Sequence, residues 1–437
     1  MDPRDARAWL DTHSNLERKV GVPAGSRRRL SPEPLSRMES LVELLGSPQL
    51  QYPAIHITGT NGKTTVARIT TALLVAAGLS VGTDTSPYLE RFNERISWNG
   101  EPIPDEELDR ILVEIAEIEP LLGDRPTYFE IVNSVALEWF ADVAVDVAVI
   151  EVGLGGTWDS TNVVDGQVAV VTNVQLDHVE YLGPTRRDIA IEKAGIVKPG
   201  STVVLGETDP ELVPIFAARA HTRMLLRDVD FGLRKNALAV GGRVVDLFTP
   251  YGEYADVFLP LHGAHQGDNA AAALAAADAF LGRALGRDLV VDAFASVESP
   301  GRLEVVGTHP LVVIDGTKNV AGAHAVRDAL DEEFPHVART WVIGVLRQKD
   351  AGEMLGALGV APGDRVIACR PEIPRARDPE EVAAAARELG VPESQIEVVD
   401  QVADAVERAV ATTDPDGQVV VAGSLYVAGP ARTTLLH

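Results

Sequence analysis

Short apolar runs alternate with longer helix-like stretches along this chain, which is the pattern of repeated βα units. Residues 54–58 predict a short strand, and residues 64–77 predict a helix that is rich in small side chains. Residues 145–152 and 168–174 are almost continuously apolar. Strands of a parallel sheet that is covered on both faces show such runs, so the first half of the chain predicts a central, mostly parallel sheet.

A stretch of turn residues at 296–302 (Ser-Val-Glu-Ser-Pro-Gly-Arg) has the composition of a linker. Before it, residues 201–260 predict less regular strands and loops, between helices expected at 189–197 and 270–281. After it, a second βα series predicts a helix at 380–389 and strands at 311–314, 341–345, 365–368, 396–399 and 419–422. The expected fold class is therefore α/β, with a larger domain at 1–297 and a smaller Rossmann-like C-terminal domain at 298–437.

The length and charge of the chain narrow the choice of function. At 437 residues the chain exceeds what one hydrophobic core usually supports, which agrees with two domains. Its formal net charge of −25 argues against nucleic acid or an anionic membrane as a partner. No apolar stretch is long enough to cross a bilayer, and the first five residues lack the pattern of a secretory signal, so a cytoplasmic location is expected.

The sharpest motif is a glycine-rich stretch that follows the first expected strand and opens a helix. It consists of Gly59, Thr60, Asn61, Gly62, Lys63, Thr64 and Thr65. Backbone N–H groups of such a loop cradle phosphate oxygens, helped by the positive end of the helix. Lys63 can reach the β- and γ-phosphates, and the Thr64 hydroxyl can meet Mg²⁺. The spacing G-x-x-G-K-T is tighter than the general P-loop, but its setting favours a P-loop domain over a simple helix-capping turn.

Two further side chains are expected at the same edge of the sheet. Glu151 ends the strand at 145–152, and His178 follows the strand at 168–174. Because the carboxyl ends of parallel strands meet at one edge, both can approach Lys63 and Thr64. A carboxylate, a neutral imidazole and phosphate oxygens suit Mg²⁺ that is bound with ATP. Taken singly, Glu151 could equally be a surface carboxylate, and His178 would more simply be a loop histidine.

Motifs near the linker fit poorly with a plain ATPase. His265, Gln266 and Asn269 stand at a helix start, and the turns at 300–302 and 315–319 flank the linker, where two domains could clamp a nucleotide. Lys193 lies in the helix at 189–197 and would by itself be a solvated lysine.

At these residues the chain resembles the folylpolyglutamate synthase and dihydrofolate synthase family, within the larger group of Mur-type amide ligases. The matching motifs run in family order from about residue 50 to residue 432. They are residues 59–65, 86–89 (Ser-Pro-Tyr-Leu), 91, 93–96, 151–162, 177–183, 192–200, 265–270, 300–305, 349–350 (Lys-Asp) and 423–426 (Gly-Ser-Leu-Tyr). Coverage this wide is more specific than any single motif.

The resemblance implies a role for each matching residue. Residues 59–65 would bind the ATP phosphates, and Asn269, Arg302 and Asp315 would contact the nucleotide from the second part of the site. The metal ligands, for two magnesium ions, would be Thr64, Ser86, Glu151 and His178. Lys193 would be carbamylated, which requires a deprotonated amine. The expected catalytic residues are Lys63, Lys193, His178 and Lys318, and the expected substrate contacts are Thr157, Trp158, Asp159 and Ser424.

The reaction that the resemblance implies is phosphoryl transfer followed by acyl transfer. A substrate carboxylate attacks the γ-phosphate of ATP, and the amine of L-glutamate then displaces phosphate from the acyl phosphate to form an amide. The expected acceptors are dihydropteroate, a tetrahydrofolate or both, and the expected cofactors are ATP and Mg²⁺. No nucleic-acid or membrane partner is expected, and the protein is expected to be a monomer.

Two departures from the family affect the choice of acid. The family has Gly-Gly-Arg-Leu-Asp after the metal glutamate, whereas this chain has Gly-Gly-Thr-Trp-Asp at 155–159, which removes a cation and adds the Trp158 ring. The family's Asp-Gly-Ala-His-Asn-Pro becomes Asp-Gly-Thr-Lys-Asn-Val at 315–320. Lys318 can still attract a carboxylate or phosphate but cannot act as a neutral imidazole. These changes leave two alternatives open: a ligase of the same fold that acts on a non-folate acid, and a nucleotide-binding regulator that has lost ligation.

Overall fold

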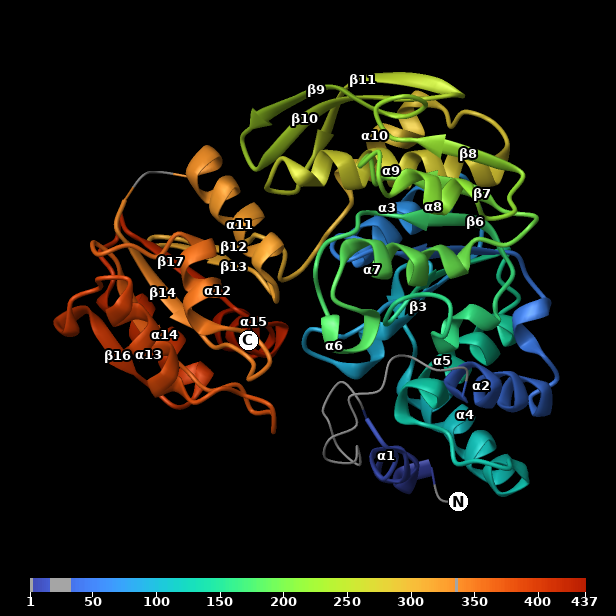
Figure 1. Ribbon diagram of the computed structural model, residues 1–437, viewed down its shortest axis with the longest axis horizontal. Helices are drawn as coiled ribbons and strands as arrows, with labels where there is room; N and C mark the ends of the chain where they lie inside the picture. The colour runs from blue at the N-terminus through green and yellow to red at the C-terminus, as the bar shows by residue number, and fades with distance from the viewer. Residues whose placement is uncertain (1–2, 16–32, 335–336) are drawn as a thin grey trace.

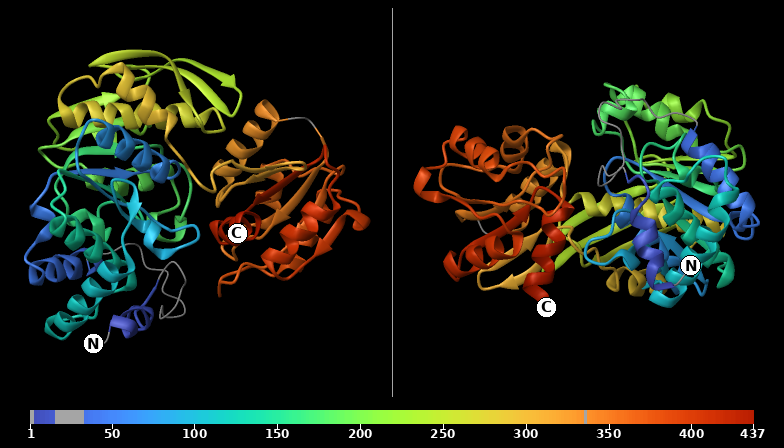
Figure 2. Two further views of the ribbon diagram at one scale, coloured as in Figure 1. Left: turned by 180° about the vertical axis from the view of Figure 1, so that it is seen from behind. Right: turned by 90° about the horizontal axis from the view of Figure 1, so that it is seen from below.

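The computed structural model describes residues 3–15, 33–334 and 337–437. Met1 and Asp2, the first residues of the N-terminal stretch that lacks the pattern of a secretory signal, lie outside these ranges. The chain forms two lobes that lie side by side (Figure 1). The larger lobe holds an eight-stranded and a three-stranded sheet, and the smaller lobe holds a six-stranded sheet. Figure 2 shows from two other directions that the last third of the chain, in orange and red, stands apart from the rest.

The eight-stranded sheet organises the larger lobe. Its strand order is β4-β3-β2-β5-β1-β6-β7-β8. All neighbours are parallel except β2–β3 and β3–β4 at one edge. The strands are β1 (Ala54–Thr58), β2 (Val81–Asp84), β3 (Ile96–Trp98), β4 (Glu101–Pro102), β5 (Val147–Glu151), β6 (Gly166–Val171), β7 (Thr202–Leu205) and β8 (Arg223–Leu226). Every residue of β1 and β5 is buried, as the continuous apolar runs predicted.

Helices cover both faces of this sheet. On one face, α3 (Lys63–Ala76) packs against the alanine-rich α9 (His265–Leu281) and α10 (Arg287–Ala295), because small side chains allow a close approach. The other face carries the remaining helices of the lobe. They are α1 (Pro3–Asp11), α2 (Glu33–Leu44), α4 (Asp105–Ile118), α5 (Tyr128–Asp142), α6 (Val179–Leu182), α7 (Arg186–Lys193) and α8 (Val213–Ala217), with short 3-10 turns at Pro48–Leu50, Phe92–Arg95, Glu119–Leu121, Ser160–Val163 and Ala194–Ile196.

Residues 201–260, predicted as less regular strands and loops, do contain strands, but these strands are more regular than predicted. This segment contains β7, β8 and a regular antiparallel sheet of β9 (Gly232–Ala239), β10 (Gly242–Thr249) and β11 (Gly252–Leu259), drawn above α9 and α10 in Figure 1. Several residues of β9 and β11 are exposed, and the pairing register shifts in β10. Solvent exposure and these shifts break the apolar alternation by which a strand is recognised from sequence.

The smaller lobe is an open α/β layer of strand order β12-β13-β17-β14-β15-β16, parallel except for β12. The strands are β12 (Glu304–Thr308), β13 (Leu311–Ile314), β14 (Arg339–Ile343), β15 (Arg365–Ala368), β16 (Ile396–Val398) and β17 (Gln418–Ala422). The helices are α11 (Val320–Glu333), α12 (Ala351–Leu358), α13 (Pro379–Glu388), α14 (Val402–Thr412) and α15 (Leu425–Leu436), and a 3-10 turn spans Glu393–Gln395. The α/β fold class is confirmed, and only β12 was missed among these strands.

None of the helices within the described ranges is long and apolar enough to span a bilayer.

Candidate active site between the lobes

The phosphate loop connects β1 to α3. Gly59 and Gly62 have φ angles of 152° and 83°, in the region that favours glycine. A Cβ atom at Gly62 would lie 2.4 Å from Oδ1 of Asn269 on α9, so this loop and the start of α9 touch through a glycine. Gly62 has no side chain to cap α3, which leaves the first N–H groups of the helix to a ligand.

Glu151, at the end of β5, collects polar groups from the neighbouring loops. The Thr64 hydroxyl donates a hydrogen bond to its Oε2 at 2.9 Å, and the backbone N–H of Ser86 donates to the same oxygen at 3.3 Å. Lys63 Nζ lies 3.9 Å from its Oε1. The strand order predicted this convergence, because β1 and β5 are parallel neighbours.

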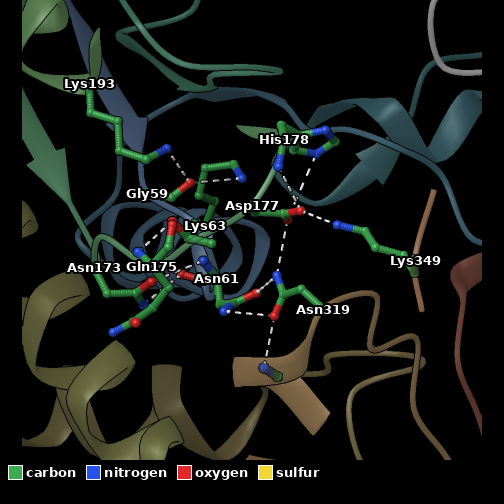
Figure 3. Close-up of polar contacts among 12 residues, drawn as sticks. Gly59, Asn61, Lys63, Asn173, Gln175, Asp177, His178, Lys193, Asn319 and Lys349 are labelled. Carbon is green, nitrogen blue, oxygen red and sulfur yellow. Dashed lines mark hydrogen bonds and ion pairs between the residues drawn. The ribbon is translucent and has the colours of Figure 1, made fainter. Parts of the chain in front are cut away.

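Lys193, at the end of α7, points to the back of the phosphate loop rather than to solvent. Its amine donates to the carbonyl oxygen of Gly59 at 2.8 Å, and Lys63 donates to the same oxygen at 3.2 Å (Figure 3). Burial, and next the positive charge of Lys63, lower the pKa of Lys193 well below its ordinary value. Burial therefore favours the neutral form of this amine.

Asp177 and His178 lie in the loop between β6 and α6. Burial lowers the pKa of His178 to about 3 against the opposing charge of Asp177, so the imidazole is neutral. Burial alone would raise the pKa of Asp177, but the charges of Lys318 and Lys349 and the hydrogen bond from Lys349 outweigh it and hold the pKa well below the usual range. The pair is a neutral ring beside a firmly ionised carboxylate.

Two side chains of the smaller lobe reach this carboxylate. Asn319, just before α11, donates from Nδ2 to Asp177 Oδ2 and to Asn61 Oδ1, each at 3.0 Å. Lys349, just before α12, donates to Asp177 Oδ1 at 2.5 Å. Figure 3 shows Asp177 between His178 and these two residues. The smaller lobe is thus joined directly to the phosphate loop and to the loop after β6.

Asp315 and Lys318 lie in the turn between β13 and α11. Asp315 accepts hydrogen bonds from the backbone N–H groups of Leu303 and Thr317 at 2.9 and 2.7 Å. Burial raises the pKa of Asp315 to about 6, although Arg302 opposes the shift. Burial, and then the charge of Lys63, lower the pKa of Lys318 to about 8. Lys318 is therefore a cation that can lose its proton near neutral pH.

A cavity of about 780 Å³ lies between the two lobes. Most of the side chains expected at the site line it. They are Thr60, Asn61, Gly62, Lys63, Thr64, Thr65, Ser86, Glu151, Trp158, Asp159, His178, Asn269, Arg302, Asp315, Lys318 and Ser424. Gly59, Thr157 and Lys193 do not line it. Thr157 instead donates to the carbonyl oxygen of Glu192 at 3.0 Å and packs against Gly195.

Phe129, Asp177 and Lys349 are among the cavity residues to which the sequence assigned no role, and neither did it assign one to Asn319, which binds Asp177. The only sequence signal for a role of three of them, Asp177, Asn319 and Lys349, is their position in or beside the family motifs. Their pairing joins positions up to 172 residues apart, and no local spacing rule reports such a contact.

Comparison with known proteins agrees with this geometry. Residues 105–277 match the Mur ligase middle domain, and residues 301–425 match the Mur ligase, glutamate ligase domain. The dihydrofolate synthase/folylpolyglutamate synthase of Mycobacterium tuberculosis is 40% identical over 93% of this chain and 90% of its own length. The folylpolyglutamate synthase of Lacticaseibacillus casei is 36% identical over 92% of this chain and 94% of its own.

Solved structures give the same result. The Mycobacterium tuberculosis folylpolyglutamate synthase complexed with ADP superposes with a TM-score of 0.90 at 38% identity, covering 100% of this chain and 98% of that one. An Escherichia coli structure solved in complex with DHPP and ADP has a TM-score of 0.83 at 30% identity, covering 97% of this chain and 96% of that one. This chain belongs to the folylpolyglutamate synthase and dihydrofolate synthase family of Mur ligases.

Proposed function

We propose that this protein is an ATP-dependent ligase that joins L-glutamate through an amide bond to dihydropteroate, to a tetrahydrofolate or to both. The observation that carries the proposal is the cavity between the two lobes. Phosphate-binding and carboxylate groups from the larger lobe line it together with cationic and polar groups from the smaller lobe. A reaction that activates one acid and then admits an amine needs such a shared, water-poor space.

ATP is the proposed nucleotide. Relatives with solved structures hold ADP, and the glycine loop, the uncapped start of α3 and Lys63 offer this chain's own phosphate contacts. Asn269, Arg302 and Asp315 line the same cavity and are proposed to hold the rest of the nucleotide.

Mg²⁺ is the proposed metal, and the residues present fit it. The described residues contain no cluster of three or more His, Cys, Asp or Glu side chains that could hold an ion alone. Mg²⁺ usually takes one or two carboxylates and completes its shell with water and substrate phosphates. Thr64, Ser86, Glu151 and His178 are the proposed ligands, and the Thr64 hydroxyl already touches the Glu151 carboxylate. When bound, the ion would neutralise charge on the transferring phosphoryl group.

The proposed chemistry has two steps. A carboxylate oxygen of the acid attacks the γ-phosphorus, the bond to the β–γ bridging oxygen breaks, and ADP leaves. The glutamate nitrogen then attacks the acyl carbon, phosphate departs with the carbon–oxygen electron pair, and the nitrogen loses a proton. Lys63 holds the γ-phosphate during the first step. Lys318, while protonated, attracts the carboxylate or phosphate that faces it.

Carbamylation of Lys193 is a further part of the proposal. The reaction with CO₂ needs a neutral amine, and the lowered pKa of the buried Lys193 amine favours that form. Its contact with the Gly59 carbonyl places it behind the phosphate loop, where a carbamate would add negative charge next to the proposed metal ligands.

The acid is proposed to lie along the side of the cavity that includes Trp158 and Asp159. Trp158 offers a flat ring surface and Asp159 a carboxylate. A second candidate, a ligase for a non-folate acid, is favoured by one observation: Trp158 lines the cavity whereas Thr157, at the family's arginine position, does not.

The decisive experiment supplies the purified protein with ATP, Mg²⁺, L-glutamate and a panel of acids that includes dihydropteroate, tetrahydrofolate and acids without a pterin ring. Amide product and ADP are measured together. We expect equal amounts of both with a pterin acid and no product from Lys63→Ala. Normal turnover is expected from the control Lys235→Ala, which removes an exposed ion pair between Lys235 on β9 and Asp256 on β11. Turnover with a non-pterin acid alone would support the second candidate.

The division between domains, at residues 297 and 298, is proposed to lie in the segment that joins α10 to β12. A monomeric, cytoplasmic enzyme stays a prediction.

A further inference from the structure

A chain of hydrogen bonds runs from the centre of the large sheet to the wall of the cavity. It begins at His56 in β1, whose Nε2 lies 3.0 Å from the hydroxyl oxygen of Thr161. That hydroxyl lies 2.5 Å from Oδ1 of Asp159, which lines the cavity. His56 is completely buried, and Asp159 is 6% exposed. The mechanism above uses neither His56 nor Thr161.

The direction of the donors along this chain follows from what surrounds His56. Burial, and next the charge of Lys198, lower the pKa of His56 to about 3, so the ring is neutral and carries one proton. Nδ1 is buried without a hydrogen-bond partner among the described residues. A proton there would be a buried, unpaired donor, which costs more than an unpaired acceptor site on a ring nitrogen. Nε2 therefore carries the proton and donates it to Thr161.

Since the Thr161 oxygen accepts from His56, its own proton is free to point at Asp159. The same Oδ1 also accepts from the backbone N–H of Thr161 at 3.0 Å, and Oδ2 accepts from the N–H of Leu154 at 2.8 Å. Burial raises the pKa of Asp159, and these hydrogen bonds oppose the shift. These donors hold the Asp159 carboxyl group in place from the protein side.

We infer that His56 and Thr161 are positioning residues for the acid substrate. Through their aligned hydrogen bonds they hold Asp159 as a fixed acceptor beside Trp158, and so they set the affinity for an acid whose ring carries N–H donors. The inference rests on the proposed function, because it assigns the Asp159 side of the cavity to the acid. The proposed nucleotide contacts lie on other residues, so the affinity for ATP does not depend on the hydrogen bonds from His56 through Thr161 to Asp159.

A pair of substitutions at one position tests the inference. Thr161→Val keeps the shape of the side chain but removes the hydroxyl, and it raises KM for the pterin acid by on the order of 10- to 100-fold, the usual cost of a lost buried hydrogen bond. Thr161→Ser keeps the hydroxyl and stays close to wild type. KM for ATP is the same in all three proteins. An unchanged KM for the acid in Thr161→Val, or a parallel rise for ATP, overturns the inference.

Thr70→Val is the matched control. Thr70 is buried in α3, and its hydroxyl has no hydrogen-bond partner within the described structure. The same loss of a hydroxyl at Thr70 removes no hydrogen bond to Asp159, so the KM values for the acid and for ATP stay at the wild-type level. This comparison separates the loss of a hydroxyl from the loss of this particular hydrogen bond.

A second measurement needs no turnover. Nitrogen-15 NMR of histidine-labelled, ligand-free protein, with His56 assigned from a His56→Gln variant, reports which ring nitrogen is protonated. We expect a neutral Nε2–H ring across about pH 5 to 8. A Nδ1–H ring overturns the inference whatever the substrate. A wild-type protein that ligates no pterin acid contradicts the proposed function, while the NMR result still stands.

Discussion

Lys193 shows how position changes the chemistry of a residue. Taken singly in its helix it would be a solvated lysine, whereas the family resemblance implied a deprotonated amine. The structure buries it against the carbonyl oxygen of Gly59 and lowers its pKa. Lysine is suited to such a site because its amine loses a proton when buried, whereas arginine stays charged. Lys318, at a position where the family has histidine, is likewise a buried lysine with a lowered pKa.

We expect Lys193→Ala to raise the Mg²⁺ concentration for half-maximal rate by about 10- to 100-fold, the usual effect of losing a group that supports a metal ligand. Carbon-13 NMR with labelled bicarbonate checks the cause. We expect the wild-type protein to show a carbamate signal that is lost in Lys193→Arg, because arginine keeps its charge. A wild-type protein without this signal, but with full activity after CO₂ removal, contradicts the carbamate.

The lowered pKa of Lys318 predicts that the reaction rate falls at alkaline pH. Its pKa is lowered to about 8, so the amine is charged below that pH and loses its charge as the pH rises through it. The rate at limiting ATP should therefore fall above about pH 8. In Lys318→Arg the charge persists, so the fall moves to higher pH. A pH–rate profile checks this, with Lys235→Arg as the exposed control; identical profiles for wild type and Lys318→Arg would exclude the role.

At the scale of the element, the loop between β1 and α3 depends on glycine for two separate reasons. Gly62 has a positive φ, and its missing Cβ leaves room for Asn269. Gly78, just after the same helix, also has a positive φ, of 90°, but has open space around it. The two positions therefore separate backbone strain from loss of space.

We expect Gly62→Ala and Gly78→Ala each to lower the free energy of unfolding by about 1–2 kcal/mol, because both place an L side chain at positive φ. Only Gly62→Ala should also raise KM for ATP, since its Cβ must displace Asn269 from its 2.8 Å hydrogen bond with Gln266. Urea unfolding and steady-state kinetics check the two effects. An equal rise of KM in both variants would show that strain alone disturbs the loop.

At the scale of the whole molecule, α11 ties the lobes together at both of its ends. Asn319, before its first turn, binds Asn61 and Asp177 at the active site. Glu333, in its last turn, accepts from the backbone N–H of Gly263 and from His262, both at 2.8 Å, and also from Arg243 on β10. Lobe position and phosphate-loop geometry are therefore linked through one helix.

Loss of the contacts between the smaller lobe and Asp177 should uncouple ATP hydrolysis from amide formation. Lys349→Met removes the ion pair with Asp177, and we expect more ADP than amide product, because a less firmly held smaller lobe admits water to the activated acid. The ratio of ADP to product measures this directly. Lys235→Met, which breaks the exposed pair with Asp256, should keep the ratio at one. A ratio of one in Lys349→Met would show that this ion pair does not hold the lobes.

The sequence by itself determined the class of fold, the family and the phosphate loop. Continuous apolar runs identified β5 and β6, and short apolar stretches of the βα series identified β1 and β13 to β17. The glycine motif required only neighbouring residues, so local pattern was sufficient. It failed for β9 to β11, where exposed strands with shifted register carry little apolar signal. The parallel order of β5, β1 and β6 then made the approach of Glu151 and His178 to Lys63 predictable from the ends of strands.

Tertiary structure alone decided the state and the partners of individual side chains. Some of these features are contacts between residues that are distant in sequence: Thr157 with Glu192, Asp177 with Asn319 and Lys349, and His56 with Thr161. Another is a change of pKa, which burial against the Gly59 carbonyl causes in Lys193. A pKa depends on the desolvation and charge that surround a group, and a hydrogen bond depends on two atoms meeting within about 3 Å. Neither quantity is encoded in local sequence spacing; both arise when the lobes and layers pack.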